Sequence, residues 1–224
     1  MKPIYLIGDV HGCYKTMIAL IEKLPKDAEI CFLGDLIDRG QNSASVIQYV
    51  IDNNHYCVRG NHEDMMINYQ PPGPYGETSA WFTNGGMETF ENYNDFETLN
   101  AHRNWLKKLP LFIEFKDKFI KTDKKRSLVV SHSSVAGVWN KMEDRSWTSI
   151  EDHILWNRDV KKNDISKDGS IFNVFGHTIL SEVKIEDHYA CIDTGCVYKR
   201  EKYGHLTALE FPSLRVITQK NIED

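Results

Sequence analysis

The sequence predicts a single domain of the α/β class. In residues 1–63, three apolar runs typical of strands alternate with two segments of helical periodicity. This alternation is the pattern of a parallel βαβ half-sheet. Strand-like runs dominate the second half of the chain. At 224 residues, with 41% hydrophobic and 26% charged residues, the chain can bury one full core without disulfides.

The N-terminal half should contain three strands, each followed by a loop with glycine. They are expected at residues 4–7, 29–33 and 55–58. Between the first two, residues 14–24 carry apolar side chains at helical spacing, and Pro25 ends the helix. The next helix begins near Asn42 and Ser43, whose side chains suit an N-cap.

Residues 64–109 are predicted to form a helical cap within the same domain. A Pro- and Gly-rich loop at 70–76 interrupts it, and a helix is expected at 97–109. Asn84–Gly86 either shapes a substrate cleft or makes a plain turn. Further strands are expected at 111–115, 118–121, 127–130, 171–175, 188–192, 206–210 and 214–218. The basic segment 116–126 is interpreted as a solvated hairpin rather than a docking patch.

Charge and composition restrict the class of partner and the compartment. A net charge of −5 argues against nucleic acid or a membrane surface as a partner, so an anionic substrate would need local cations. Five cysteines without a C-x-x-C pair indicate reduced thiols. No apolar run is long enough to span a membrane, and Gly8 and Asp9 come too early for a signal peptide. We therefore expect a cytoplasmic protein.

Residues of metal-ligand type follow five of the predicted strands. They are Asp9 and His11, Asp35, Asn61, His132, and His177. Ligands of α/β sheets bind beyond the carboxyl ends of the strands, and this donor mixture suits Mn²⁺, Fe or Zn²⁺ better than Ca²⁺. Asp35, in the middle loop, is the natural carboxylate to bridge two ions. Two metals about 3.5–4 Å apart generate hydroxide near neutral pH and clamp a phosphoryl displacement.

A thiol-phosphatase mechanism is excluded by spacing. Cys13 and Cys196 lie near the motif loops, but such a mechanism needs an arginine six positions after the cysteine. Position 19 is alanine and position 202 is lysine.

The order and spacing of three motifs resemble the PPP-type metallophosphoesterases. The motifs are Gly-Asp-x-His-Gly at 8–12, Gly-Asp-x-x-Asp-Arg-Gly at 34–40 and Gly-Asn-His-Glu at 60–63. Three later segments resemble the bacterial and phage branch, which includes the phage lambda serine/threonine phosphatase and symmetrical diadenosine tetraphosphatases. These segments are Leu-Trp-Asn-Arg at 155–158, Gly-His-Thr at 176–178 and Ile-Asp-Thr-Gly-Cys at 192–196. The resemblance extends from Gly8 to about Leu209.

This resemblance implies a four-layer α/β/β/α sandwich, the calcineurin-like metallophosphoesterase fold, in one domain spanning 1–224. The first functional expectation is a serine/threonine protein phosphatase that uses a hydroxide bridging two divalent ions, with Mn²⁺ ahead of Fe or Zn²⁺. Its substrate would be a phosphorylated protein or peptide. The alternative is a symmetrical bis(5'-nucleosyl)-tetraphosphatase acting on dinucleoside polyphosphates. A non-catalytic binding scaffold is the third possibility, and it would require gaps in the ligand set.

The resemblance also implies a role for each motif residue. One ion would be held by Asp9, His11 and Asp35, and the other by Asp35, Asn61, His132 and His177. His62 would be the general acid and Asp38 its orienting partner. The arginines expected to bind phosphate are Arg39, Arg59 and Arg158.

Some positions depart from the family pattern or allow a second interpretation. Ser133 and Ser134 replace the Gly-Gly pair of eukaryotic relatives. The eukaryotic C-terminal tail motif is absent, so no regulatory subunit is expected. Arg158 could lie on the surface beside a packed Leu155–Trp156 pair, and Asp193 is interpreted as a turn cap.

Overall fold

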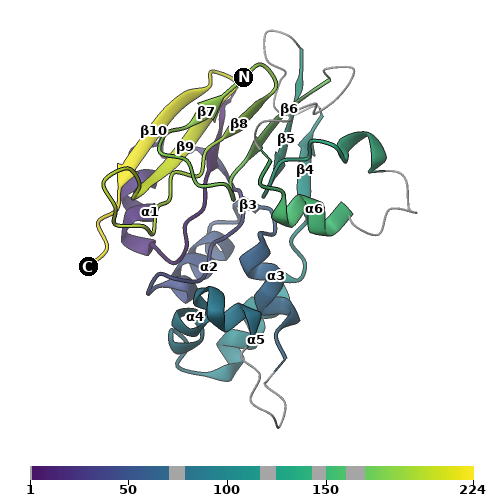
Figure 1. Cartoon of the computed structure of the whole chain (residues 1–224). Helices are drawn as coiled ribbons and strands as arrows, with labels where there is room; N and C mark the ends of the chain where they lie inside the picture. Colours follow the sequence, from purple (N-terminus) through teal and green to yellow (C-terminus); the bar gives the residue numbers. More distant parts are fainter. Residues whose placement is uncertain (1, 71–78, 117–124, 143–149, 160–169) are drawn as a thin grey trace.

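The computed structural model describes residues 2–70, 79–116, 125–142, 150–159 and 170–224. Within these residues, two five-stranded sheets lie face to face (Figure 1). The first has the strand order β10-β9-β1-β2-β3 and contains the three predicted N-terminal strands. Its strands are β1 (Ile4–Ile7), β2 (Glu29–Phe32), β3 (Tyr56–Cys57), β9 (His205–Phe211) and β10 (Arg215–Lys220). β1, β2 and β3 are parallel, whereas β9 pairs antiparallel with both β1 and β10.

The second sheet has the order β4-β5-β6-β8-β7. Its strands are β4 (Phe112–Phe115), β5 (Ser127–Ser131), β6 (Ile171–Phe175), β7 (Lys184–Ile185) and β8 (Tyr189–Cys191). β5, β6 and β8 run parallel, so their carboxyl ends point the same way. The two-residue strand β7 was not predicted, because so short a segment has no detectable periodicity.

Helices cover the outer faces of both sheets. On the first sheet, α1 (Tyr14–Ile21) and α2 (Ser43–Asp52) share a hydrophobic cluster with β1 and β2. The same cluster continues into the elements α3 (Asn61–Asn68), the π-helical segment η1 (Phe82–Gly86), α4 (Met87–Glu91) and α5 (Phe96–Leu106). In Figure 1, α2 to α5 gather below the sheets. The outer face of the second sheet carries the 3₁₀ turn η2 (Trp139–Lys141) and α6 (Ile150–Trp156).

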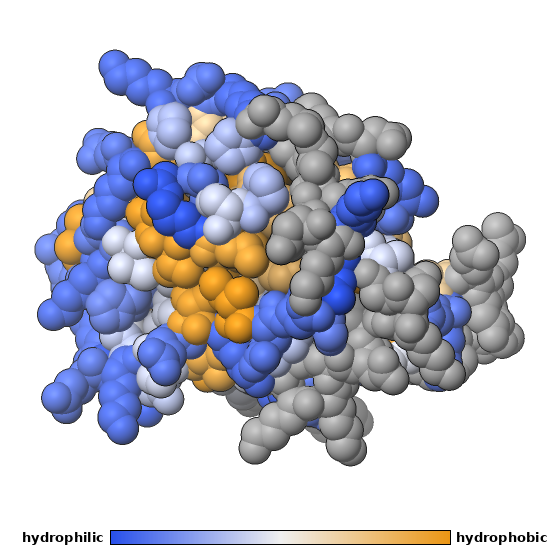
Figure 2. Space-filling view, turned by 90° about the horizontal axis from the view of Figure 1, so that it is seen from above, coloured by the Kyte–Doolittle hydropathy of each residue, from blue (hydrophilic) through white to orange (hydrophobic). Residues whose placement is uncertain are grey.

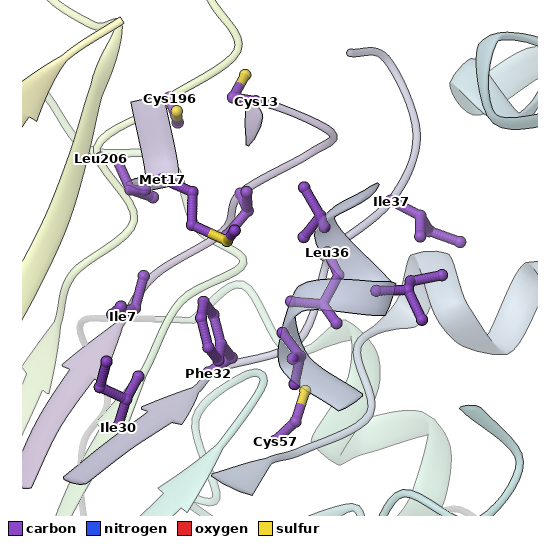
Figure 3. Packing of buried hydrophobic residues seen from close by; sticks show 14 of the residues in the cluster. Ile7, Cys13, Met17, Ile30, Phe32, Leu36, Ile37, Cys57, Cys196 and Leu206 are labelled. Carbon is purple, nitrogen blue, oxygen red and sulfur yellow. The ribbon is translucent and has the colours of Figure 1, made fainter. Parts of the chain in front are cut away.

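Side-chain alternation along β1 explains the layering. Ile4 and Leu6 point into the core between the sheets, whereas Tyr5 and Ile7 point toward the helices. Figure 3 shows the core under the helices, where Phe32 of β2 packs near Met17 of α1 and Leu36 of the loop that follows β2. The α/β/β/α architecture expected from the sequence is therefore confirmed.

The starts of two helices differ from the expectations, one in its position and the other in its capping. α3 begins at Asn61, so part of the third motif is the first turn of a helix rather than a loop. At α2 the Asn42 side chain makes no capping bond. Instead Asn92 Oδ1 accepts from Ser43 N at 2.8 Å, and local sequence could not reveal a partner 49 positions away.

Several expectations fall wholly or mainly on residues outside the described part. These are the strand at 118–121, most of the basic segment 116–126 and most of the loop at 70–76. In the described residues, no helix is long and apolar enough to cross a membrane. Figure 2, which views the molecule from above, shows hydrophobic residues gathered at the centre of that end, between hydrophilic ones.

Candidate metal centre

The loops after β1 and β2 are joined by backbone hydrogen bonds. Val10 N and His11 N both donate to the carbonyl of Asp35, at 3.0 and 2.9 Å, and Gly12 N donates to Leu36 O at 2.8 Å. Several non-glycine residues in and near this region have positive φ, a strained conformation that clusters at functional sites. The positive-φ residues that lie in the sequence motifs are His11, Asp35, Asp38, Arg39 and His177.

Asp35 lies between two sets of histidines. Its Oδ2 is 3.6 Å from His11 Nε2, and its Oδ1 is 3.5 Å from His132 Nε2. Burial would raise the pKa of Asp35, but His132, His62 and His11 outweigh it and hold that pKa below its usual value. Each carboxylate oxygen thus faces a different imidazole, which is the geometry that a bridging ligand requires.

Hydrogen-bond acceptors converge around His132. Its Nδ1–H donates to the carbonyl of Leu33 at 2.8 Å, so Nε2 of the neutral ring carries no hydrogen. That Nε2 lies 2.8 Å from Asn61 Oδ1 and 3.1 Å from His177 Nδ1. Burial lowers the pKa of His132, and burial with the neighbouring His132 lowers that of His177 to about 3. Neutral acceptors facing one another suit a bound cation.

The donor chemistry fits a pair of divalent ions. Two groups of possible ligand atoms, each within 4.8 Å, share Asp35. They are His11, Asp35 and His62, and Asp35, His132 and His177. His11 Nδ1–H also donates to a backbone carbonyl, that of Ile37 at 2.8 Å. Such bonds fix the tautomer in which Nε2 carries no hydrogen, as a ligand nitrogen must.

Asp9 occupies a buried position on the β6 side of the cluster. Its carboxylate accepts from His177 N at 3.1 Å. Burial, with repulsion from Asp193 and Asp35, raises the pKa of Asp9 well above its usual value. A cation at this point would relieve that cost. The pairing of Asp9 with His11 on one ion stays a prediction, because the contact seen here is with the second histidine loop.

His62 and Asp38 form a buried pair. His62 Nδ1 is 2.6 Å from Asp38 Oδ2. Trp81 Nε1 donates to the same carboxylate at 3.0 Å and Thr89 Oγ1 at 2.7 Å. Burial opposes the charged imidazole, but Asp35 and Asp38 together raise the pKa of His62. Trp81 and Thr89 thus fix the Asp38 carboxylate, which in turn orients the His62 ring.

Arg39 is directed into the cluster. Its guanidinium donates to His11 Nε2 and, at 2.9 Å, to His62 Nε2. Its backbone N–H donates to Gly85 O at 3.0 Å. Gly85 has φ +99°, and a Cβ there would lie 2.7 Å from Arg39 Cγ, so a larger residue would displace the arginine. The Asn84–Gly86 segment therefore supports Arg39 and is not a plain turn.

The other two arginines lie differently. Arg158 Nη1 donates to His177 O at 3.4 Å, so it borders the second histidine pair. Arg59 instead donates to the carbonyls of Lys107 and Leu109, at 3.0 and 3.3 Å. It also approaches Asp64 and Glu151. Its contacts in the described residues are therefore with the α5 end and with carboxylates outside the cluster, and its phosphate-binding role stays a prediction.

Glu63 is a site residue to which the sequence interpretation gave no role. Its buried carboxylate accepts from the backbone N–H groups of Asp35, Leu36 and Gly60, each at 2.8 Å. Burial and the nearby Asp35 raise its pKa to about 7. The signal was available, since glutamate three residues after Gly60 is the capping-box spacing.

Trp81 and Thr89 were also missed, and Asp193 was predicted only as a turn cap. Trp81 and Thr89 lie 43 and 51 positions from Asp38, so nothing local predicts their contact. Asp193 Oδ1 accepts from Gly195 N at 2.9 Å, which is the expected turn cap. Asp193 is also buried, and repulsion between it and Asp9 places it at the edge of the cluster.

The fold and this cluster define a metallophosphoesterase. The family model for calcineurin-like phosphoesterases matches residues 2–216, so the chain belongs to that family. Members carry a dinuclear divalent metal centre, and the residues described above offer its ligands.

Individual relatives are similar over different extents. An asymmetrical bis(5'-nucleosyl)-tetraphosphatase from Anoxybacillus flavithermus is 26% identical, over 95% of this chain and 92% of its own. A symmetrical enzyme of the same name from Buchnera aphidicola is 30% identical over 61% of this chain and 45% of its own. A serine/threonine phosphatase from Saccharomyces cerevisiae superposes with a TM-score of 0.65 at 16% identity, covering 100% of this chain and 81% of that one, and shows the shared fold.

Proposed function

We propose that this protein is a dinucleoside polyphosphate hydrolase that cleaves diadenosine tetraphosphate asymmetrically into ATP and AMP. The observation that carries the reaction class is the position of Asp35 between two histidine groups. The substrate class is supported by the names of three relatives that match 95% of the chain, each an asymmetrical bis(5'-nucleosyl)-tetraphosphatase. Those names favour the second sequence expectation over a protein phosphatase, although cleavage is proposed to be asymmetrical rather than symmetrical.

The residues of the cluster divide the work. Asp9, His11, Asp35, Asn61, His132 and His177 would hold the ions, with Mn²⁺ proposed first. When bound, the ions lower the pKa of water so that it attacks near neutral pH, and they neutralise charge on the phosphate. Arg39 and Arg158 would orient the phosphate oxygens. His62 Nε2 accepts from Arg39 in this structure. When Arg39 turns to the phosphate and the imidazole is protonated, His62, oriented by Asp38, would give the Nε2 proton to the leaving phosphate oxygen.

The test is a comparison of substrates with the full chain and Mn²⁺. We expect equal amounts of ATP and AMP from diadenosine tetraphosphate, separated by anion exchange. We expect kcat/KM on this substrate to exceed that on phosphoserine, phosphothreonine and phosphotyrosine peptides.

Two results would decide against the proposal. Two molecules of ADP per substrate would show symmetrical cleavage. Higher kcat/KM on a phosphopeptide would favour the protein phosphatase. The variant Asp35→Asn, which lacks the proposed bridge, controls for a contaminating hydrolase.

A further inference from the structure

A cleft of about 300 Å³ shares Arg39 with the metal centre. Arg39 lines it on one side and also donates to His11 and His62, so this residue belongs to both places. Cys13, two positions after His11, lies on the same wall. The cleft is therefore an extension of the proposed active site.

The cleft and its margin are rich in cations, although the chain as a whole is acidic with a net charge of −5. Lys15 and Lys199 line it together with Arg39. The Arg39 guanidinium lies 5.8 Å from the centroid of the Tyr198 ring, and that of Arg200 lies 5.9 Å from the same centroid. A second cavity, of about 460 Å³, shares Lys199 and contains Arg200. Basic residues thus extend outward from Arg39 through both cavities, where they lie beside the acidic residues Glu201, Glu223 and Asp224.

The chain's own C-terminal residues already place oxygen atoms against these cations. The Asp224 carboxylate pairs with Lys15, and Lys199 Nζ donates to the backbone carbonyls of Glu223 and Asp224. The Glu223 carboxylate accepts from Thr16 N at 2.8 Å, at the first turn of α1. The start of α1 has no side-chain cap of its own, so an anion is favourable there.

We propose that this cleft binds the phosphates of a polyphosphate substrate that are not being attacked, with Lys15 and Lys199 as specificity residues. The inference rests on the function proposed above. A monoester needs only the metal centre and its arginines, whereas a tetraphosphate carries further negative charge that must lie outside it. Asp224, whose side chain is 94% exposed, would give up Lys15 to that charge.

The experiment separates binding from turnover. For the double variant Lys15→Gln/Lys199→Gln, we expect KM for diadenosine tetraphosphate to rise about 10-fold, which equals about 1.4 kcal/mol, with kcat changing less than twofold. KM and kcat for p-nitrophenyl phosphate should also change less than twofold. Asp224→Asn should lower KM for the tetraphosphate, because a competing carboxylate is gone. Lys202→Gln is the matched control, because Lys202 is an exposed lysine of the same segment. It should change KM and kcat for neither substrate.

A second measurement keeps the two proposals distinguishable. The inhibition constant of a non-hydrolysable methylene analogue of diadenosine tetraphosphate is measured against p-nitrophenyl phosphate at constant free Mn²⁺. It should rise about 10-fold in the double variant. If the wild type does not hydrolyse the tetraphosphate, the proposed function fails. The ratio of the inhibition constants of the double variant and the wild type still tests whether the cleft binds the phosphates. An unchanged inhibition constant, or an equal loss on p-nitrophenyl phosphate, would overturn the inference.

Discussion

At the scale of the residue, the centre depends on what each oxygen and nitrogen of a few side chains faces. The two oxygens of Asp35 face different histidines, at 3.6 and 3.5 Å. The Nδ1–H groups of His11 and His132 both donate to backbone carbonyls, so Nε2 of each ring faces the cluster. Ligand geometry is therefore fixed by bonds outside the ligand set.

Asp35→Asn should abolish metal pairing and activity together. The amide nitrogen cannot ligate, so one of the two ions loses its shared oxygen. We expect kcat/KM to fall by more than the roughly 100-fold that loss of an outer partner can cost. Metal content, measured by mass spectrometry after gel filtration, should fall below the two ions per chain expected of the wild type. Two retained ions would show that Asp35 is not the bridge.

Asp38→Asn should slow turnover while both ions stay bound. The Asp38 side chain contacts His62, Trp81 and Thr89, and none of these three is a proposed metal ligand. We expect kcat to fall about 10- to 100-fold. Loss of an ion from this variant would contradict the division of roles between Asp35 and Asp38.

At the scale of the element, the first turn of α3 joins the second and third motif loops. Glu63 accepts three backbone N–H groups from both loops. Gly60 lets them approach, because a Cβ there would lie 2.2 Å from Asp35 Oδ1 and 2.4 Å from Asp35 N.

Gly60→Ala should therefore displace Asp35 and lower both metal affinity and activity. Gly137→Ala is the matched control: its φ of +83° is also strained for alanine, but its nearest neighbouring atom is 3.9 Å away. The control should lose about 1–2 kcal/mol of stability and keep its activity. Thermal unfolding and a Mn²⁺ titration of activity distinguish the two. Equal metal affinity in both variants would contradict the close-approach argument.

The attachment of α5 to α2 should depend on pH. Buried His102 donates from Nε2 to Gln48 Oε1 of α2 at 3.0 Å and accepts at Nδ1 from the Tyr93 hydroxyl at 2.8 Å. Burial lowers the pKa of His102, only partly offset by Asp52. Below about pH 6.5 the unfolded chain therefore binds a proton that the folded chain does not, and stability falls with acidification.

His102→Gln should reduce this dependence. Calorimetric Tm values at pH 7, 6 and 5 should fall less steeply for the variant than for the wild type, although the variant starts lower at pH 7. Parallel slopes would show that His102 does not contribute to the acid sensitivity.

At the scale of the whole molecule, the centre lies where the two sheets meet. Asp35 follows β2 of one sheet, and His132 and His177 follow β5 and β6 of the other. Because no unfolded chain brings these residues together, metal binding should be coupled to folding.

Mn²⁺ should accordingly stabilise the wild-type fold. At a free concentration 100-fold above Kd, each independent site adds about 2.7 kcal/mol to the free energy of unfolding. Tm should rise with Mn²⁺ relative to chelated protein, and Asp35→Asn should lose most of the rise. A concentration-independent Tm in the wild type would contradict the coupling.

The sequence by itself determined the α/β class and the candidate metal ligands, for a local reason, and the four-layer arrangement was implied by the family resemblance. Strand periodicity and the glycine after each strand are local properties, and residues that follow neighbouring parallel strands lie at one edge of a sheet. This rule groups Asp35 with Asn61, after β2 and β3, and His132 with His177, after β5 and β6. That the two pairs meet across the two sheets was implied by the family resemblance. The family resemblance added roles, and the structure adds the distances.

Only the tertiary structure decided which side chains support the cluster and how the arginines point. Trp81 and Thr89 reach Asp38 across 43 and 51 positions, and Asp224 reaches Lys15 across 209. Arg39 and Arg59 look alike in sequence, yet Arg39 enters the cluster and Arg59 binds backbone carbonyls of Lys107 and Leu109, just after α5. Such contacts depend on the packing of distant helices and loops, and no periodicity along the chain encodes them.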